Sequence, residues 1–406
     1  MALKINIARL MRPSGIALLA VTLSFCAWLC PDFGELRKGF TVAEHPGFFS
    51  SLIVFSWYLL IFTGLALGQR LGAGFAGGRI RQPNLPPLDS PFIYGTFTVL
   101  GAIGTIDTFI RIFQALPLFQ ALLYIYLGQA NRLKVTLYEG YSAGIPSLRY
   151  LVLYSASLSI YRFVKRKRIS FLGILNLLLL GATVFISSRL ILIATLLLSA
   201  FLIGYGKQTI RISLLKLGVF TALIFVVLSV LNSSRNKNFY SSRNQSFAQA
   251  GLSEIITYLG SPFHVSLGAA SRIDDIVAGP ADLYREYIDV EEALTTNSAF
   301  VQLHEQMGYL AWPYIGIVCC LMGFMFTWLT SFGKTALLLP SGAILYGAAE
   351  LWRIDLFQQG IFIVWFVVGI ALPATLLLFG KRRLPRQART RRVRILGSTD
   401  LPEPQT

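Results

Sequence analysis

The sequence predicts an all-α protein: a polytopic bundle of about ten transmembrane helices with both termini in the cytoplasm. Three observations predict this class. Of the 406 residues, 54% are hydrophobic and only 14% are charged, with a mean hydropathy of +0.62, whereas a soluble domain carries roughly 25% charged residues. Apolar runs of about 20 residues, the length that crosses a bilayer, recur along the chain. Basic residues also gather in connections that this arrangement places on one side of the membrane.

The first span follows Lys4, Arg9 and Arg12. No A-x-A-like cleavage site comes after it, so we expect a retained span rather than a cleaved signal peptide. Further apolar runs follow in order, and several are bounded by proline, where helices commonly start or stop. In total we predict spans at residues 15–30, 50–68, 92–113, 145–164, 169–187, 189–206, 213–231, 309–330, 335–350 and 358–380.

One other apolar stretch, residues 114–130, does not fit as a crossing. A full span there would place the basic loop at 162–168 outside the cell, against the rule that positive loops stay inside. We therefore predict a re-entrant or interfacial helix on the outer side, with an eleventh span as the alternative. Irregular backbone at membrane depth is tolerated only where protein buries it or where it lines a cavity.

The net charge of +17 follows from this topology and needs no nucleic-acid partner. Lysine and arginine concentrate in the loop 162–168 and in the tail, and such segments of membrane proteins face the cytoplasm. The predicted domains are an N-terminal transmembrane bundle at 1–231, a large outer loop at 232–308, C-terminal spans at 309–380 and a basic cytoplasmic tail at 381–406.

The outer loop has apolar residues at helical spacing between Leu252 and Leu267. This pattern predicts an amphipathic helix that lies on the membrane face, or alternatively a small packed cap. No internal repeat is visible in the sequence, whereas many secondary transporters are built from twin halves.

The candidate binding residues are arginines predicted on the outer side, where the charge rule leads us to expect few cations. A guanidinium presents a rigid fork of donors that suits phosphate, so several at one depth would form a site for an anionic lipid headgroup. Alternatively, each arginine snorkels to the interface, Arg353 pairs with Glu350 or Asp355, and Arg111 pairs with Asp107 four residues earlier. The arginines are Arg111, Arg132, Arg149, Arg189, Arg235, Arg243, Arg272 and Arg353.

A base for a sugar hydroxyl is available at His304 or Glu305. Tyr258 and His264 are candidate substrate contacts in the same outer loop, although tyrosine and histidine are more often packing residues there. The three histidines and four cysteines lack metal-ligand spacing, so no metal site is predicted. No Walker A motif occurs and no cofactor is expected. An enzyme of this kind must use a lipid-linked substrate that is already activated.

Four segments carry a family resemblance. They are VFISSRLILIATLLL with Arg189, the loop sequences NSSRNKNFYSSRNQSF and YLGSPFHVSLGAASRIDD, then TNSAFVQLHEQMGYLAWPYIGIVCCLMGF, and AAELWRIDLFQQG with Arg353. With ten or more spans and one dominant outer loop late in the chain, most of residues 90–380 resembles the Wzy-type polymerases of O-antigen or oligosaccharide repeat units.

The resemblance implies a GT-C-like fold and a bacterial inner-membrane glycosyltransferase whose site faces the periplasm. Such an enzyme transfers a glycan from undecaprenyl pyrophosphate to a new lipid-linked repeat unit, which builds O-antigen, capsule or exopolysaccharide. The implied partners are the undecaprenyl-pyrophosphate-linked oligosaccharide, the bilayer and a chain-length regulator protein. The arginines expected to hold pyrophosphate are Arg149, Arg189, Arg243, Arg272 and Arg353.

Three other functions fit parts of the pattern. An O-antigen ligase shares the GT-C plan but transfers glycan to the lipid A core. A transporter or flippase of lipid-linked sugars predicts charges near the midplane and pseudo-symmetric halves, whereas these arginines cluster toward the outer face. A non-catalytic scaffold would have arginines that only snorkel.

Overall fold

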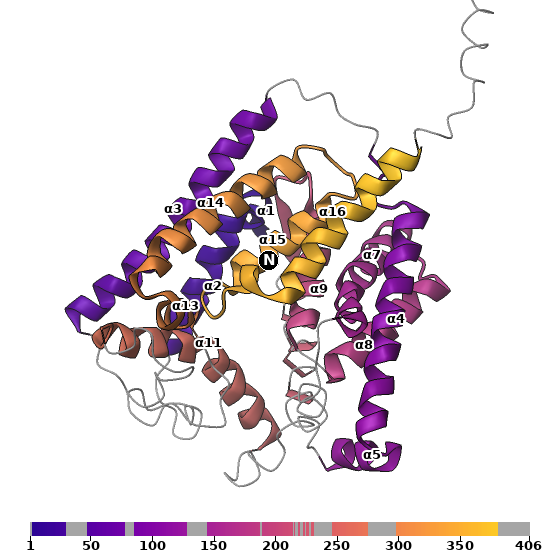
Figure 1. Cartoon of the computed structure of the whole chain (residues 1–406), viewed down its shortest axis with the longest axis horizontal. Helices are drawn as coiled ribbons and strands as arrows, with labels where there is room; N and C mark the ends of the chain where they lie inside the picture. The colour runs from indigo at the N-terminus through magenta and orange to yellow at the C-terminus, as the bar shows by residue number, and fades with distance from the viewer. Residues whose placement is uncertain are drawn as a thin grey trace, which may run out of the picture.

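The computed structural model describes residues 2–29, 47–77, 85–127, 144–186, 189–213, 246–274 and 298–380, with scattered positions between 215 and 230. These residues form a bundle of helices (Figure 1). Three helices, α3 (Phe48–Gly77), α4 (Pro91–Ala115) and α16 (Gly360–Gly380), are long and apolar enough to cross a membrane. The run from α13 (Ala299–Met307) through η3 (Gly308–Leu310) and α14 (Ala311–Thr330) is as well. The chain is therefore a helical membrane protein.

The remaining helices are not among the four candidate spans: all but α11 are shorter, and several are strongly apolar. Each predicted span coincides with a helix except 213–231, which lies largely outside the described residues, and the number of crossings stays a prediction. These helices are α1 (Ile7–Leu10), α2 (Pro13–Trp28), α5 (Leu118–Tyr126), η2 (Ile145–Leu151), α7 (Val152–Arg166), α8 (Phe171–Ile186), α9 (Arg189–Gly204), α11 (Phe247–Ser271), α15 (Leu338–Glu350) and η4 (Leu356–Gln358).

The described residues confirm the predicted all-α class and add one pair of short strands. The strand β1 (Ala2–Ile5) pairs antiparallel with β2 (Ile210–Ser213), so that Ala2 lies opposite Ser213 and Ile5 opposite Ile210. Four residues are too few to show a period of two in the sequence. The pairing ties the chain before α2 to the connection after α9.

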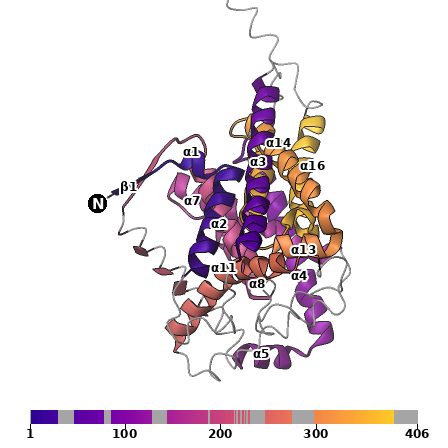
Figure 2. The same ribbon diagram turned by 90° about the vertical axis from the view of Figure 1, so that its left-hand side faces the viewer.

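The two ends of the bundle differ in character. At one end, which we call the basic end, the chain before α2 meets the connection that follows α9, and the segment before α4 meets the end of α7 and the connection that follows α14. The opposite end, which we call the α11 end, carries α5, α11 and α13 (Figures 1 and 2). Contacts that join the basic end are Ala8 N to Gln208 O at 3.4 Å, Leu88 N to Lys334 O at 3.2 Å and Lys165 Nζ to Asp89 Oδ2 at 2.8 Å. The basic loops thus share one end, and the membrane side that it faces stays a prediction.

Glycine allows α3 and α14 to pack backbone against backbone. A Cβ added to Gly68 would lie 1.9 Å from the Cys320 carbonyl oxygen, and one added to Gly323 would lie 2.3 Å from the Leu65 carbonyl oxygen. In lipid the hydrophobic effect does not drive helices together, so close packing at small residues does much of this work. The spacing of Gly64, Gly68 and Gly72 is the sequence signal for this contact.

Hydroxyl and amide groups join α4, α7 and α8. The Tyr94 hydroxyl lies 2.9 Å from Ser159 Oγ, and Asn176 Nδ2 donates to Thr98 Oγ1 at 3.0 Å. All four side chains are buried. Hydrogen bonds between membrane helices contribute modestly, on average about 0.6 kcal/mol each, but they fix which faces meet.

The segment predicted as an amphipathic helix forms α11. Ser246 and Gln249 cap its start reciprocally, and all residues from 260 to 270 are buried. Ser24 Oγ on α2 donates to the Leu259 carbonyl at 2.6 Å, and the Phe263 ring lies 5.3 Å from that of Phe25. The second half of α11 is therefore packed over the ends of α2 and α3 rather than lying on a surface.

The stretch predicted not to cross the membrane forms α5 after a break at Leu116 and Pro117. The helix runs across the end of α4 instead of continuing it (Figure 1). Phe119 and Tyr126 are exposed. The chain thus bends between α4 and α5, and whether the stretch is re-entrant, interfacial or a full crossing stays a prediction.

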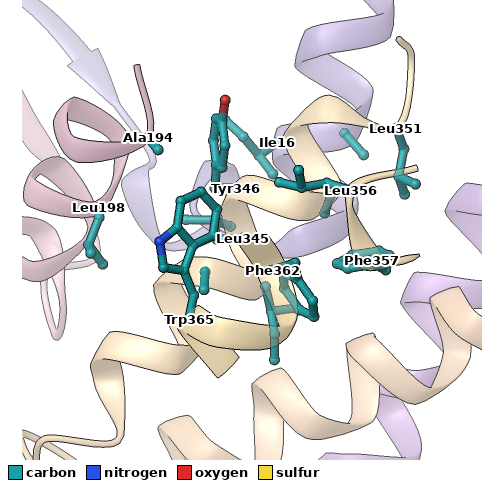
Figure 3. Close-up of a cluster of buried hydrophobic side chains, with 14 of the residues drawn as sticks. Ile16, Ala194, Leu198, Leu345, Tyr346, Leu351, Leu356, Phe357, Phe362 and Trp365 are labelled. Atoms are coloured by element: carbon teal, nitrogen blue, oxygen red, sulfur yellow. The ribbon is translucent and has the colours of Figure 1, made fainter. Parts of the chain in front are cut away.

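The centre of the bundle is α15, which is buried almost throughout. Gly342 leaves room for Leu198 of α9, and Gly347 leaves room for the Phe357 ring. Figure 3 shows Tyr346 of α15 beside Trp365 of α16, with ring centroids 6.0 Å apart. This core supports the end of α15, where the candidate site begins.

Candidate functional site

The candidate site lies where the C-terminal end of α15 meets α11. Arg353 Nε lies 3.4 Å from Glu350 Oε2, and its guanidinium lies 4.7 Å from the centroid of the Tyr258 ring. Tyr258 also packs edge-on against Trp352 at 5.9 Å. The hydroxyl of Tyr346, one turn before Glu350, lies near the same carboxylate. We call Tyr258, Tyr346, Glu350 and Arg353 the Arg353 site.

The ion pair in the Arg353 site is shielded but loose. The side chains of Arg353 and Glu350 are 12% and 6% exposed. Their 3.4 Å separation exceeds the roughly 2.7–2.9 Å of a tight charge-assisted hydrogen bond, and neither Arg353 Nε nor Glu350 Oε2 has a hydrogen-bond partner among the described residues. Shielded charges interact more strongly than exposed ones, so this guanidinium can gain by binding a second anion.

Arg149 is buried and bonded inside the bundle. It is 1% exposed, and its guanidinium donates to Thr108 Oγ1 at 3.3 Å, the Pro146 carbonyl at 3.1 Å and the Tyr150 hydroxyl at 2.7 Å. Trp365 Nε1 donates to the Tyr150 carbonyl at 2.7 Å. The bond to Thr108 joins η2 to α4, and the bonds to Pro146 and Tyr150 lie within η2. These bonds favour a structural role for Arg149, and its predicted contact with pyrophosphate stays a prediction.

His304 lies on α13, beside the C-terminal end of α11. Its Nε2 lies 3.0 Å from the Ile273 carbonyl oxygen. A carbonyl only accepts, so Nε2 carries the proton and Nδ1 keeps a lone pair. Nδ1 is buried and has no hydrogen-bond partner among the described residues. Beside it, Tyr309 donates a hydrogen bond to Asp274, and the exposed Arg272 ends α11. We call Arg272, Asp274, His304 and Tyr309 the His304 site.

The two sites lie at different positions along α11. Tyr258 and Arg272 are about four turns apart, and at about 1.5 Å per residue they are separated by at most about 20 Å. Pro262 lies inside the helix between them. Arg353 and Arg272 therefore belong to two sites that contact different parts of α11, and the binding of pyrophosphate at either site stays a prediction.

The other predicted residues have mixed positions. His264 is buried on α11, and Glu305 is half-buried beside His304 on α13. Arg111 pairs with Asp107 at 3.0 Å, which confirms the predicted i,i+4 ion pair. Arg189 begins α9, but its side chain lies outside the described residues, and Arg132, Arg235 and Arg243 lie outside them entirely.

Sequence reasoning missed Tyr346. Its place four residues before Glu350 puts both on one helix face, and that spacing was the available signal.

Among the described residues, no group of three or more His, Cys, Asp or Glu side chains could hold a metal ion.

No known protein family, curated protein or solved structure matches this chain.

Proposed function

We propose that this chain is an inner-membrane polymerase that joins undecaprenyl-pyrophosphate-linked oligosaccharide repeat units into a surface polysaccharide on the periplasmic face. The observation that carries the proposal is the Arg353 site: a shielded guanidinium in a membrane protein, loosely paired with Glu350 and set against Tyr258. Arginine forks suit pyrophosphate, and intramembrane cations without a structural need mark substrate sites.

The two sites along α11 suit a reaction with two lipid-linked substrates. Each substrate carries its own pyrophosphate, and Arg353 and Arg272 provide one cation for each. In this scheme Arg272 holds the departing pyrophosphate of the donor, beside His304, while Arg353 holds the acceptor's pyrophosphate and Tyr258 stacks on its sugars. Holding both substrates on one helix supplies proximity and orientation.

The bond changes balance without a cofactor. The acceptor hydroxyl oxygen attacks the anomeric carbon of the donor, the bond from that carbon to the pyrophosphate oxygen breaks, and the proton passes to His304 Nδ1. The leaving pyrophosphate takes the electron pair, and Arg272 stabilises its developing charge. Because the His304 ring is 1% exposed, Tyr309, whose ring lies 5.4 Å away, must move aside to admit the hydroxyl.

The test is polymerisation by the purified protein in lipid nanodiscs, with an undecaprenyl-pyrophosphate-linked repeat unit as the only substrate. Arg353→Ala should weaken acceptor binding and raise the KM for the acceptor at least about tenfold, and Arg353→Lys should restore only part of the affinity because the fork geometry is lost. Arg111→Ala is the matched control, since Arg111 already pairs with Asp107.

Two outcomes would overturn the proposal. Unchanged polymerisation kinetics in a correctly folded Arg353→Ala protein would remove the role of the Arg353 site. Product that forms only when a lipid A core acceptor is added would identify the ligase alternative, and movement of the lipid-linked sugar across the membrane without bond formation would identify a transporter.

A further inference from the structure

A cavity of about 280 Å³ opens at the basic end, far from the Arg353 site along the bundle. It lies between α1, the end of α9 and the end of α14. Ile7, Met11, Phe201 and Phe326 give it apolar walls. Gly204 also lines the cavity and packs against Ile7: a Cβ added at position 204 would lie 2.8 Å from Ile7 Cδ1.

Three cations surround this cavity. Arg12 and Lys207 line it and are exposed, and Lys334 approaches Gly206, another lining residue, so that an added Cβ there would lie 3.9 Å from Lys334 Cε. Within the described residues, no acidic side chain pairs with any of the three. The group is therefore a net positive rim on an apolar pocket.

The Tyr205 hydroxyl inside the cavity already has a partner. It donates to the Thr330 carbonyl at 2.6 Å, so it needs no polar ligand in the pocket. The apolar helices α2, α9 and α14 begin or end here. In a membrane protein, the ends of apolar helices lie near the boundary between acyl chains and headgroups.

We infer that this cavity binds an anionic phospholipid, with its phosphate between Arg12 and Lys207 and an acyl chain along Ile7, Phe201 and Phe326. Basic pockets between membrane helices attract anionic headgroups electrostatically, and the apolar walls add the burial of a chain. A soluble phosphate would meet the cations but leave the walls empty, and a neutral lipid would fill the walls but leave the cations unpaired. The inference is independent of the proposed function.

The test is native mass spectrometry of the full-length protein, delipidated and titrated with phosphatidylglycerol or with phosphatidylcholine of the same chain length. Phosphatidylglycerol should bind more tightly. The double variant Arg12→Gln/Lys207→Gln should weaken phosphatidylglycerol binding roughly 30-fold, the loss expected for two basic side chains near a phosphate. Ala8→Trp, which places an indole in the cavity, should weaken both lipids.

The matched control is Arg166→Gln/Lys167→Gln, which removes the same charge from the basic end outside the cavity and should bind like wild type. Equal affinity of the wild-type protein for the two lipids would overturn the inference, as would equal weakening by the two double variants. Tight binding of glycerol phosphate alone would also overturn it, because the ligand would then be a soluble phosphate.

Discussion

Arg149 and Arg353 are both largely shielded in the helical bundle, but their donors are used differently. The terminal nitrogens of Arg149 donate to Thr108, Pro146 and Tyr150; the bond to Thr108 joins η2 to α4, and the other two lie within η2. Arg353 has one acidic partner among the described residues, Glu350, at 3.4 Å. The difference teaches that burial alone does not mark a ligand site, because a guanidinium with its donors already in use has little left for a substrate.

The largest effect on stability should come from a substitution at Gly104, which packs against the backbone of Arg149. A Cβ added to Gly104 would lie 2.0 Å from the Arg149 backbone nitrogen, and no side-chain rotation can relieve that clash. Gly104→Val should therefore destabilise the protein by more than about 4 kcal/mol, seen as loss of the monodisperse peak in size-exclusion chromatography. Gly95→Val on the same helix meets nothing within 4 Å and is the control; similar losses in both variants would contradict the account.

Removing the Arg149 side chain should come next. Arg149→Met leaves the Pro146 carbonyl and the Tyr150 hydroxyl without their donor, and we expect a cost on the order of 3 kcal/mol. The thermal unfolding midpoint should fall clearly, whereas the double variant Arg353→Met/Glu350→Gln, which removes both charges of the shielded ion pair, should shift it less. A large fall for that double variant and none for Arg149→Met would reverse the comparison.

Glu350 gives a second test of the comparison, because it is the acidic partner of Arg353. Glu350→Gln removes the acid that competes for Arg353, which leaves a shielded cation without a counter-charge and lowers the stability of the ligand-free protein. Inorganic pyrophosphate should then raise the unfolding midpoint by a few degrees more in Glu350→Gln than in wild type, since binding to the native state stabilises it. An equal response in both proteins would mean that Glu350 does not compete for Arg353.

The exposed ion pair of Lys165 with Asp89 at the basic end should have the smallest effect on stability. The hydrogen bond from Lys165 lowers the pKa of Asp89 from its ordinary value of 3.8. The ion pair between Lys165 and Asp89 therefore stabilises the folded protein above that value, and this contribution is lost as the pH falls through the lowered pKa. Asp89→Asn should cost less than about 1 kcal/mol at pH 7, and its difference from wild type in thermal unfolding should disappear in acid. A difference that is the same at every pH would assign it to another cause.

The positions of the helices could be predicted because apolar runs and span length are local properties of the sequence. The packing of α11 could not, since it depends on Phe25 and Ser24, which are more than 200 residues away in the chain. The roles of Arg149 and Arg353 could not be separated for the same reason: their partners Thr108 and Tyr258 come from other helices. The β1–β2 pair is too short to leave a pattern.

The most direct test of the central claim is the affinity of the purified protein for undecaprenyl pyrophosphate in nanodiscs, compared among wild type, Arg353→Ala and Arg111→Ala. We expect Arg353→Ala to weaken binding at least about tenfold, the equivalent of about 1.4 kcal/mol, in protein that still elutes as a folded, monodisperse species, while the affinity of Arg111→Ala stays close to wild type. Wild-type affinity in a folded Arg353→Ala protein would contradict the account.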